Sequence, residues 1–268
     1  MDAVSGGKNM RRKMLFVSIA LLVMLFFVET ASAQVNVATL KQLQAALAGN
    51  DEEIIVTKTI VIDEDLTLDG GGKTVKLDSN ARIQLINSAT FEHITIDGGE
   101  LQRSNSLVVV DGNEGVTLTL GDGAIIQNAR TSRNGGAIEL SSAKLQMNGG
   151  RILNCTAQNG GGIYLGSYSV VQMDDGTISR CKADENGGAI FSYVDSGSNE
   201  VNLTGGTIEG NSAKIGGGVY INYYTVVEPT DAPPFRAAKR AASVAAFNRT
   251  GGTVCCNTST EVGAGVAF

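Results

Sequence analysis

The sequence has few of the residues that fill a large globular core or bind nucleic acid. Its 268 residues include no tryptophan, one histidine and three prolines, and 27 acidic residues outnumber 21 basic ones. Residues 1–33 contain four of the basic and two of the acidic groups, so the rest of the chain has 17 against 25 and a formal charge of −8. Such a surface repels nucleic acid and anionic membranes. About 235 glycine-rich residues without tryptophan fit one elongated domain.

Long apolar runs are almost absent as well. The one such run, residues 14–28, follows three basic residues and precedes the small residues 31–33. A basic start, a short apolar run and small residues before a cleavage point are typical of a signal peptide. The run has about 15 residues, whereas a membrane-spanning helix needs roughly 20. We therefore predict a signal peptide over 1–33, a secreted or cell-surface domain over 34–268, and no stable membrane span after the signal is removed.

One short phrase recurs five times between Gly121 and the C-terminus. Its first apolar anchors are Ile125, Ile152, Ile178, Ile208 and Val254. Its later apolar anchors are Ile138, Ile163, Ile190, Val219 and Val266. The period is about 26 residues, with no helical stretch inside it, and short alternating strands punctuated by glycine at such a period indicate a β-solenoid.

Each repeat contains three short apolar pieces, such as those at 145–147, 152 and 163–165. A strand sends only every second side chain inward, so the intervening residues must face water. The glycine pairs at 149–150 and 161–162 fall between the pieces, where a sharp turn favours a positive φ. The predicted fold is all-β, a right-handed parallel β-helix with three strands per turn and about eight rungs.

Both ends of this solenoid differ from the repeats. Residues 39–49 predict a short helix that caps the N-terminal end, with a capping box from Thr39 and Gln42. Residues 226–246 form a proline-containing insertion, and its alanine-rich second half is helix-prone. The final phrase ends at Phe268 with no covering element, so we expect self-association through an uncapped C-terminal rung, a partner bound there, or a longer protein of which this chain is a fragment.

Two of the four cysteines occupy equivalent positions in neighbouring repeats. Counting from the glycine of each second strand aligns Asn128, Cys155, Cys181, Asn211 and Asn257 at one corner. Equivalent Cα atoms of stacked rungs lie about 5 Å apart, within disulfide reach, and export permits oxidation. Two interpretations stay open: a Cys155–Cys181 disulfide, or two buried thiols packed as small hydrophobic side chains.

An aromatic column is expected on the third strand of the repeats. Tyr164, Phe191 and Tyr220 each follow an inward anchor, so they should point outward and stack in one exposed column after Glu139. Exposed aromatic strips favour stacking on sugar faces or on apolar side chains of a partner. The alternative is that the column stabilises its own sheet through cross-strand contacts.

An enzymatic site would need two or three convergent carboxylates, or a cation cluster with a basic residue. The candidates are Asp97, Asp111, Glu139, Asp174, Asp175 and the only histidine, His93. Most of the aspartates adjoin corner glycines, which is ordinary turn chemistry, and alternation points His93 to solvent. The sequence therefore predicts no catalytic residues, no metal site and no cofactor.

The GGAI motifs at 135–138 and 187–190, with GGGIY, GGGVY and the GTI phrases, resemble the right-handed parallel β-helix repeats of bacterial surface proteins. These include adhesins of the polymorphic outer-membrane-protein type and, more broadly, the pectin-lyase-like superfamily. The resemblance implies a non-catalytic, adhesin-like scaffold that binds a glycan or a host or cell-surface protein. The alternative that it implies is a carbohydrate-active enzyme, either a polysaccharide lyase or a glycoside hydrolase.

Overall fold

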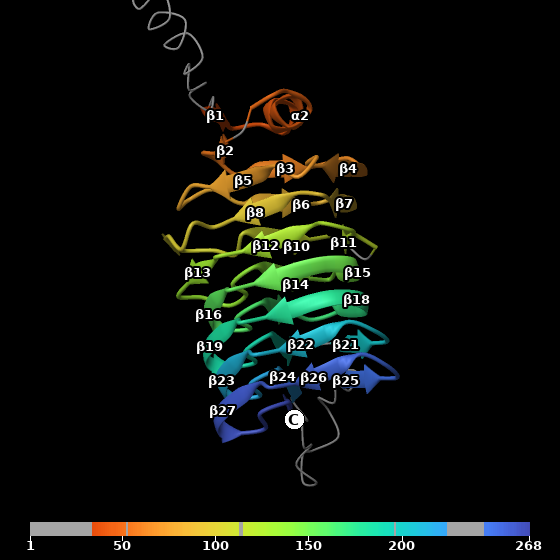
Figure 1. The fold of residues 1–268 in the computed structure, drawn as a ribbon. Coiled ribbons are helices and arrows are strands. Elements are labelled where there is room, and N and C mark those ends of the chain that lie inside the picture. Colours follow the sequence, from red (N-terminus) through yellow and green to blue (C-terminus); the bar gives the residue numbers. More distant parts are fainter. Residues whose placement is uncertain (1–33, 52, 113–114, 196, 224–243) are drawn as a thin grey trace, which may run out of the picture. The chain divides into compact units, whose positions relative to one another are not determined.

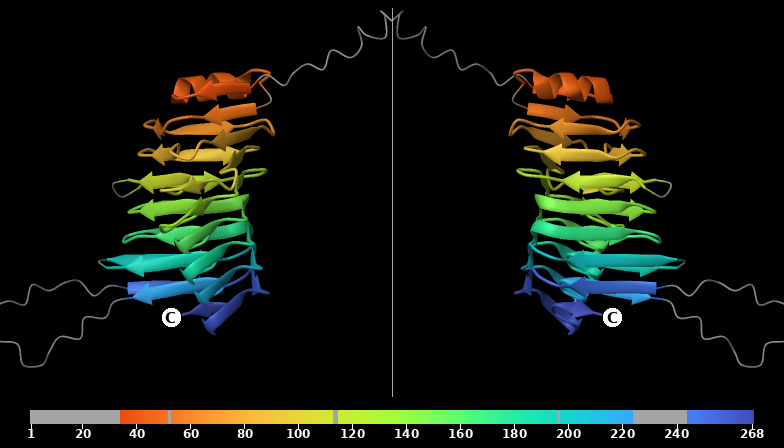
Figure 2. Two further views of the ribbon diagram at one scale, coloured as in Figure 1. Left: turned by 90° about the vertical axis from the view of Figure 1, so that its left-hand side faces the viewer. Right: turned by 90° about the vertical axis from the view of Figure 1, so that its right-hand side faces the viewer.

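The short alternating strands expected from the sequence stack rung on rung in the computed structural model (Figure 1). The structure describes residues 34–51, 53–112, 115–195, 197–223 and 244–268, and the predicted signal peptide lies outside them. All strand pairs among these residues are parallel, and the strands form three sheets that coil around one apolar core. The all-β solenoid is thus confirmed, and Figure 2 shows its rungs edge-on from two sides.

The first sheet has eight strands, in the order β28-β24-β20-β17-β14-β10-β6-β3. Its strands are β3 (Ile60–Ile62), β6 (Ile83–Leu85), β10 (Val108–Asp111), β14 (Ile138–Ser141), β17 (Ile163–Leu165), β20 (Ile190–Val194), β24 (Val219–Tyr223) and β28 (Val266–Ala267). The five later anchors of the repeat pair directly with one another in this sheet, as expected. This register positions the candidate functional site.

The second sheet has fourteen strands in two rows, which two long strands join. One row comprises β4 (Leu66–Asp69), β7 (Ala89–Glu92), β11 (Thr117–Leu120), β21 (Ser198–Leu203) and β25 (Val244–Arg249). The other row comprises β1 (Gln34–Val37), β2 (Glu53–Val56), β5 (Thr74–Leu77), β8 (Thr95–Asp97), β12 (Ile125–Gln127), β22 (Thr207–Glu209) and β26 (Thr253–Cys255). The long strands are β15 (Lys144–Leu153) and β18 (Val170–Ser179), which pass through both rows.

The third sheet was missed by the sequence prediction, which counted three strands in a turn instead of four. Its strands are β9 (Gln102–Arg103), β13 (Arg130–Thr131), β16 (Thr156–Asn159), β19 (Lys182–Asn186), β23 (Ser212–Ile215) and β27 (Thr258–Val262). They are hard to recognise in the sequence because they are short and turn few apolar residues inward, such as Ala157, Ala183 and Ala213, while β9 turns Arg103 inward. Six turns therefore have a strand on every face, and the expected eight rungs apply only to the eight-stranded sheet.

The glycines at the corner before the eight-stranded sheet have two different roles. Gly160 has a φ of 62°, a left-handed conformation that costs glycine little. Gly161 has an ordinary φ, but a Cβ there would lie 2.4 Å from the carbonyl oxygen of Gly188 on the next rung. The expectation of positive φ at 161–162 is therefore wrong, because close packing between rungs, not backbone handedness, requires glycine at these positions.

The first repeat is out of alignment by one residue. Ile126, not Ile125, pairs with Ile152, and Ala129, not Asn128, is equivalent to Cys155. Asn128 instead belongs to the preceding position. There, equivalent residues of successive turns adopt positive φ, namely Glu100, Asn128, Asn154, Arg180, Gly210 and Cys256. A shift of one residue exchanges the inward and outward faces of a strand, so this correction decides which side chains enter the core.

The N-terminal helix α2 (Leu40–Ala48) lies beside the first rungs, as the sequence predicted. Thr39 accepts a hydrogen bond from the backbone nitrogen of Gln42, and the Gln42 side chain accepts one from Ala38. Leu43 is fully buried in the common core, so the helix covers apolar surface at this end. The Lys73 ammonium of a following turn donates to the carbonyl oxygens at the helix C-terminus, where a cation is favoured.

The predicted insertion, residues 226–246, lies mostly outside the described residues. Its last three residues belong to β25, which pairs with β21. The alanine-rich segment is therefore strand, not helix, from Val244 onward. Parallel pairing with β21 outweighs the weak helix propensity of these residues.

Candidate functional site

The outward side chains of the eight-stranded sheet form one continuous column. From the N-terminal end the column contains Val61, Gln84, Val109, Glu139, Tyr164, Phe191, Tyr220 and Ala267. Each of these residues lies directly opposite the next across a parallel strand pair. The middle of the column is polar and its C-terminal part is aromatic.

The aromatic part, Tyr164, Phe191 and Tyr220, has the expected register but not the expected exposure. The ring centroids of Tyr164 and Phe191 lie 5.7 Å apart, and those of Phe191 and Tyr220 lie 5.6 Å apart and are stacked. Tyr193 also contacts Phe191, at 6.3 Å. Phe191 is consequently only 5% exposed, while the outer two rings are half-buried. Phe191 is thus unavailable for stacking on a ligand, since its neighbours cover it.

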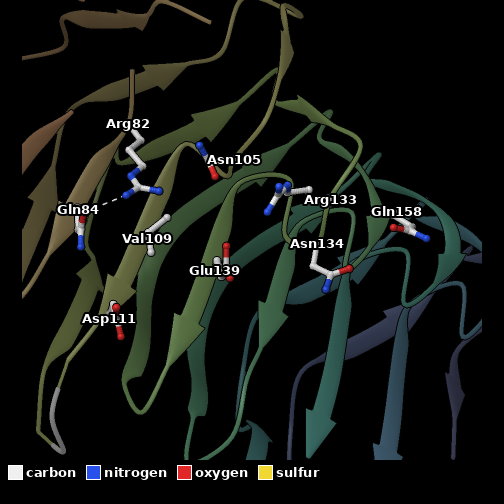
Figure 3. A pocket seen from close by; sticks show the side chains of 9 residues that line it. All are labelled: Arg82, Gln84, Asn105, Val109, Asp111, Arg133, Asn134, Glu139 and Gln158. Carbon is white, nitrogen blue, oxygen red and sulfur yellow. Dashed lines mark hydrogen bonds between the residues drawn. The ribbon is translucent and has the colours of Figure 1, made fainter. Parts of the chain in front are cut away.

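A cleft of about 410 Å³ lies over the polar part of the same column (Figure 3). Its floor consists of Gln84 from β6, Val109 from β10 and Glu139 from β14, so it crosses three neighbouring rungs. The turns before β10 and β14 form much of its rim. The full lining is Arg82, Gln84, Asn105, Val109, Asp111, Arg133, Asn134, Glu139 and Gln158.

Glu139 occupies the middle of this cleft, between Arg82 on one side and Arg133 on the other (Figure 3). It is half-buried, and within the described part of the chain no hydrogen bond or ion pair engages its carboxylate. Burial raises the pKa of Glu139, the nearby Arg82 and Arg133 oppose this rise, and Asp111 adds to it. The carboxylate is held near two cations without a direct bond to either, which leaves its oxygens available to a ligand.

A ladder of asparagine amides ends in the cleft. Asn186 donates through its side chain to Asn159 over 2.8 Å, and Asn159 donates to Asn134 over 3.0 Å. These bonds fix the Asn134 amide and use its oxygen, while its NH₂ group has no partner among the residues that the structure describes. Successive amide bonds polarise one another, so the last NH₂ is a strengthened donor.

The arginines of the rim have spare donors as well. Arg82 donates from Nη2 to the Gln84 side chain over 3.2 Å, while its buried Nε has no partner. No bond from the exposed Arg133 guanidinium to any described residue is found. The cleft thus offers both donors and acceptors, a combination that suits a ligand rich in hydroxyl groups.

Of the carboxylates considered as catalytic candidates, the structure brings together only Asp111 and Glu139. Asp97 accepts from Gly99 and Asn128, and Asp175 accepts from Gly176, so both serve turns. Asp174 is held by three side-chain donors, and the bond from Thr204, the largest cause, lowers its pKa. Most of the cleft residues were missed from the sequence. The available signal was the break in the aromatic column at Gln84, Val109 and Glu139.

His93 points to solvent, as alternation predicted, with its side chain 53% exposed. Its Nδ1 lies 3.3 Å from Asp69, and a ligand atom of Glu92 lies within 4.8 Å of both groups. The bond from the Gly71 backbone is the main cause that lowers the pKa of Asp69. Acidic groups at the surface commonly cluster in this way, and we assign no metal site here.

No known family, curated protein or solved structure gives a significant match to this chain. The likeness to adhesins and pectin-lyase-like proteins therefore rests on the repeat motifs alone. No helix in the described ranges is long and apolar enough to cross a membrane.

Proposed function

We propose that this protein is a secreted or cell-surface, non-catalytic scaffold that binds a glycan in the cleft around Glu139. One observation is central to the proposal. A half-buried carboxylate, an oriented amide NH₂ and a guanidinium line one concave surface, and none of the three is engaged by the described part of the protein. Polar groups that line a concave surface and have no partner within the fold are available to a bound ligand.

The surrounding residues fit a sugar better than a protein segment. Amide and carboxylate oxygens accept from hydroxyl groups, while Asn134 and Arg133 donate to them. Val109 provides a small apolar floor, and Tyr164, whose ring is partly exposed, pairs with Glu139 across the strand. A sugar offers the same combination of hydroxyl groups and an apolar ring face.

Titration calorimetry of the full chain against a panel of oligosaccharides tests the proposal. The sugar that binds should lose roughly tenfold or more in affinity with Glu139→Gln or Asn134→Ala, because each removes a hydrogen bond to a charged or oriented group. Asn202→Ala, an outward amide change on the fourteen-stranded sheet, is the matched control and should leave affinity unchanged. Binding that is insensitive to both cleft variants, or no binding by any sugar, would contradict the proposal.

A carbohydrate-active enzyme is the second candidate, and one observation favours it. Asp111 and Glu139 lie on neighbouring strands of one cleft, and burial raises the pKa of Glu139, as for a carboxyl that acts as an acid. Incubating the protein with polysaccharides and measuring new reducing ends or unsaturated products distinguishes the two functions. Turnover that Glu139→Gln abolishes while binding persists would establish the enzyme, and binding without turnover would support the scaffold.

A further inference from the structure

Two further chemically reactive groups lie inside the protein, at the corner between the fourteen-stranded and six-stranded sheets. Cys155 directly precedes β16, and Cys181 directly precedes β19 on the next turn. We propose that these two cysteines form a disulfide that joins neighbouring turns of the solenoid in the exported protein. This modification is independent of glycan binding and concerns how the scaffold is held together.

The register of the two strands brings the cysteines together. Thr156 pairs with Lys182 in parallel, and the Lys182 backbone nitrogen donates to the Cys155 carbonyl oxygen over 2.8 Å. The cysteines are therefore equivalent residues of hydrogen-bonded parallel strands, which lie about 4.8 Å apart. A disulfide needs Cα atoms about 4.4–6.8 Å apart, and the spacing between rungs falls within this range.

The position of these two thiols in the core makes each the only cysteine within disulfide reach of the other among the described residues. Both side chains face the core and are at most 1% exposed, and the two thiols are close neighbours. On the following turns the equivalent residues are Asn211 and Asn257, which form a buried amide ladder. Cys255 and Cys256 lie at the turn of Asn257, so the turn that contains Asn211 separates them from this pair.

The chemistry needs an external oxidant, such as oxidised glutathione or a disulfide oxidoreductase. One cysteine thiolate attacks a sulfur of the oxidant disulfide and expels one thiolate, which forms a mixed disulfide. The second cysteine thiolate then attacks the protein sulfur of that bond and expels the other thiolate. Two protons and two electrons leave the cysteines, and the oxidant is reduced to two thiols.

Oxidation must occur before the turns close. Burial is the main cause that raises the pKa of Cys155, and the adjacent Cys181 thiol adds to it, so the folded protein contains little thiolate there. Each thiol also donates to a nearby carbonyl oxygen, Cys155 to Leu153 and Cys181 to Ser179. A chain that folds fully reduced is therefore trapped with two stacked thiols.

Refolding the denatured full chain in a glutathione redox buffer tests the proposal. Trypsin cuts after Arg151, Arg180 and Lys182, so the bridge attaches the dipeptide 181–182 to the peptide 152–180 and adds its mass under non-reducing conditions. The oxidised protein should melt roughly 10 °C higher than protein refolded with a phosphine reductant, since the bridge closes a loop of one turn.

Two double variants separate this bridge from other thiol chemistry. Cys255→Ser/Cys256→Ser should keep both the linked peptide and the redox-dependent melting shift. Cys155→Ala/Cys181→Ala should lose the shift, and alanine retains most of the apolar packing needed to fold. Full alkylation of Cys155 and Cys181 after oxidative refolding, or linkage of either to Cys255 or Cys256, would overturn the proposal.

Discussion

Two neighbouring stretches of one column on the eight-stranded sheet have opposite character. Gln84, Val109 and Glu139 form the floor of an open cleft, whereas Tyr164 to Tyr220 form a stacked ladder that covers its own centre. Their backbones are equivalent, since every member pairs in register with the next. The difference therefore arises from side-chain size and from the turns beside each strand.

This comparison separates stability from recognition on a single surface. The large rings fill the space above their strands and pack against one another, so that part of the face is covered by its own side chains. Short or polar side chains leave a hollow, and the arginine and asparagine turns surround it with unpaired groups. The solenoid backbone sets only the spacing between outward side chains, and the type of outward residue on each rung determines whether that part of the surface packs on itself or can bind a ligand.

The largest expected effect is a loss of stability when the aromatic part of the column is changed. Phe191→Ala should lower the free energy of unfolding by about 3–5 kcal/mol, because it removes a buried ring between three others. Urea titration followed by circular dichroism measures this loss. Affinity for a cleft ligand should stay within twofold of the wild type, and a parallel fall in affinity at temperatures where the variant is folded would show that the two stretches are coupled.

The half-buried rings at the ends of the ladder should differ from each other in binding. Tyr164→Ser and Tyr220→Ser should each cost about 1–2 kcal/mol of stability, because each loses one aromatic contact and some apolar burial. Only Tyr164 pairs with Glu139, so its replacement should weaken sugar binding several-fold, while Tyr220→Ser serves as the matched control. Equal affinities in calorimetry would mean that the whole ladder is structural.

Glu139 should destabilise the protein at neutral pH. Its pKa is raised in the folded state by burial, so the folded state holds this proton more tightly than the unfolded chain. Its contribution to stability therefore falls as pH rises from about 4.3, the ordinary pKa, through the folded value. Glu139→Gln stays neutral, so its melting temperature should exceed that of the wild type at pH 7 and match it below about pH 4. A constant difference across this range would contradict the assignment.

The smallest effect should come from the far end of the amide ladder. Asn186→Ala removes a donor to Asn159, two rungs from the cleft residue Asn134. Because the hydrogen bonds from Asn186 to Asn159 and on to Asn134 polarise one another, affinity for the sugar should fall about two- to threefold, and stability should fall by less than about 1 kcal/mol. Asn202→Ala is again the control. An affinity identical in both variants would limit the site to its lining residues.

The sequence predicted the elements whose signals are local and repeated. The anchors from Ile138 to Val266, the helix N-cap at Thr39 and the outward register of the aromatic column all follow from alternation and spacing, and the structure confirms them. The six-stranded sheet was missed because its short strands turn few apolar residues inward, which is a weak signal. The slip at Ile125 arose because two adjacent isoleucines fit the pattern equally well, and only pairing with Ile152 distinguishes them.

By itself, then, the amino-acid sequence determined the solenoid, since a repeated pattern of inward apolar residues and corner glycines can bury its core only by stacking. The tertiary structure alone decided the cleft and the burial of Phe191. Arg82, Val109 and Glu139 lie in three different turns and share no motif, and they meet because each turn returns the chain to the same face about 4.8 Å further on. Contacts of this kind depend on the exact number of residues in every turn, which a repeat with variable corners does not specify.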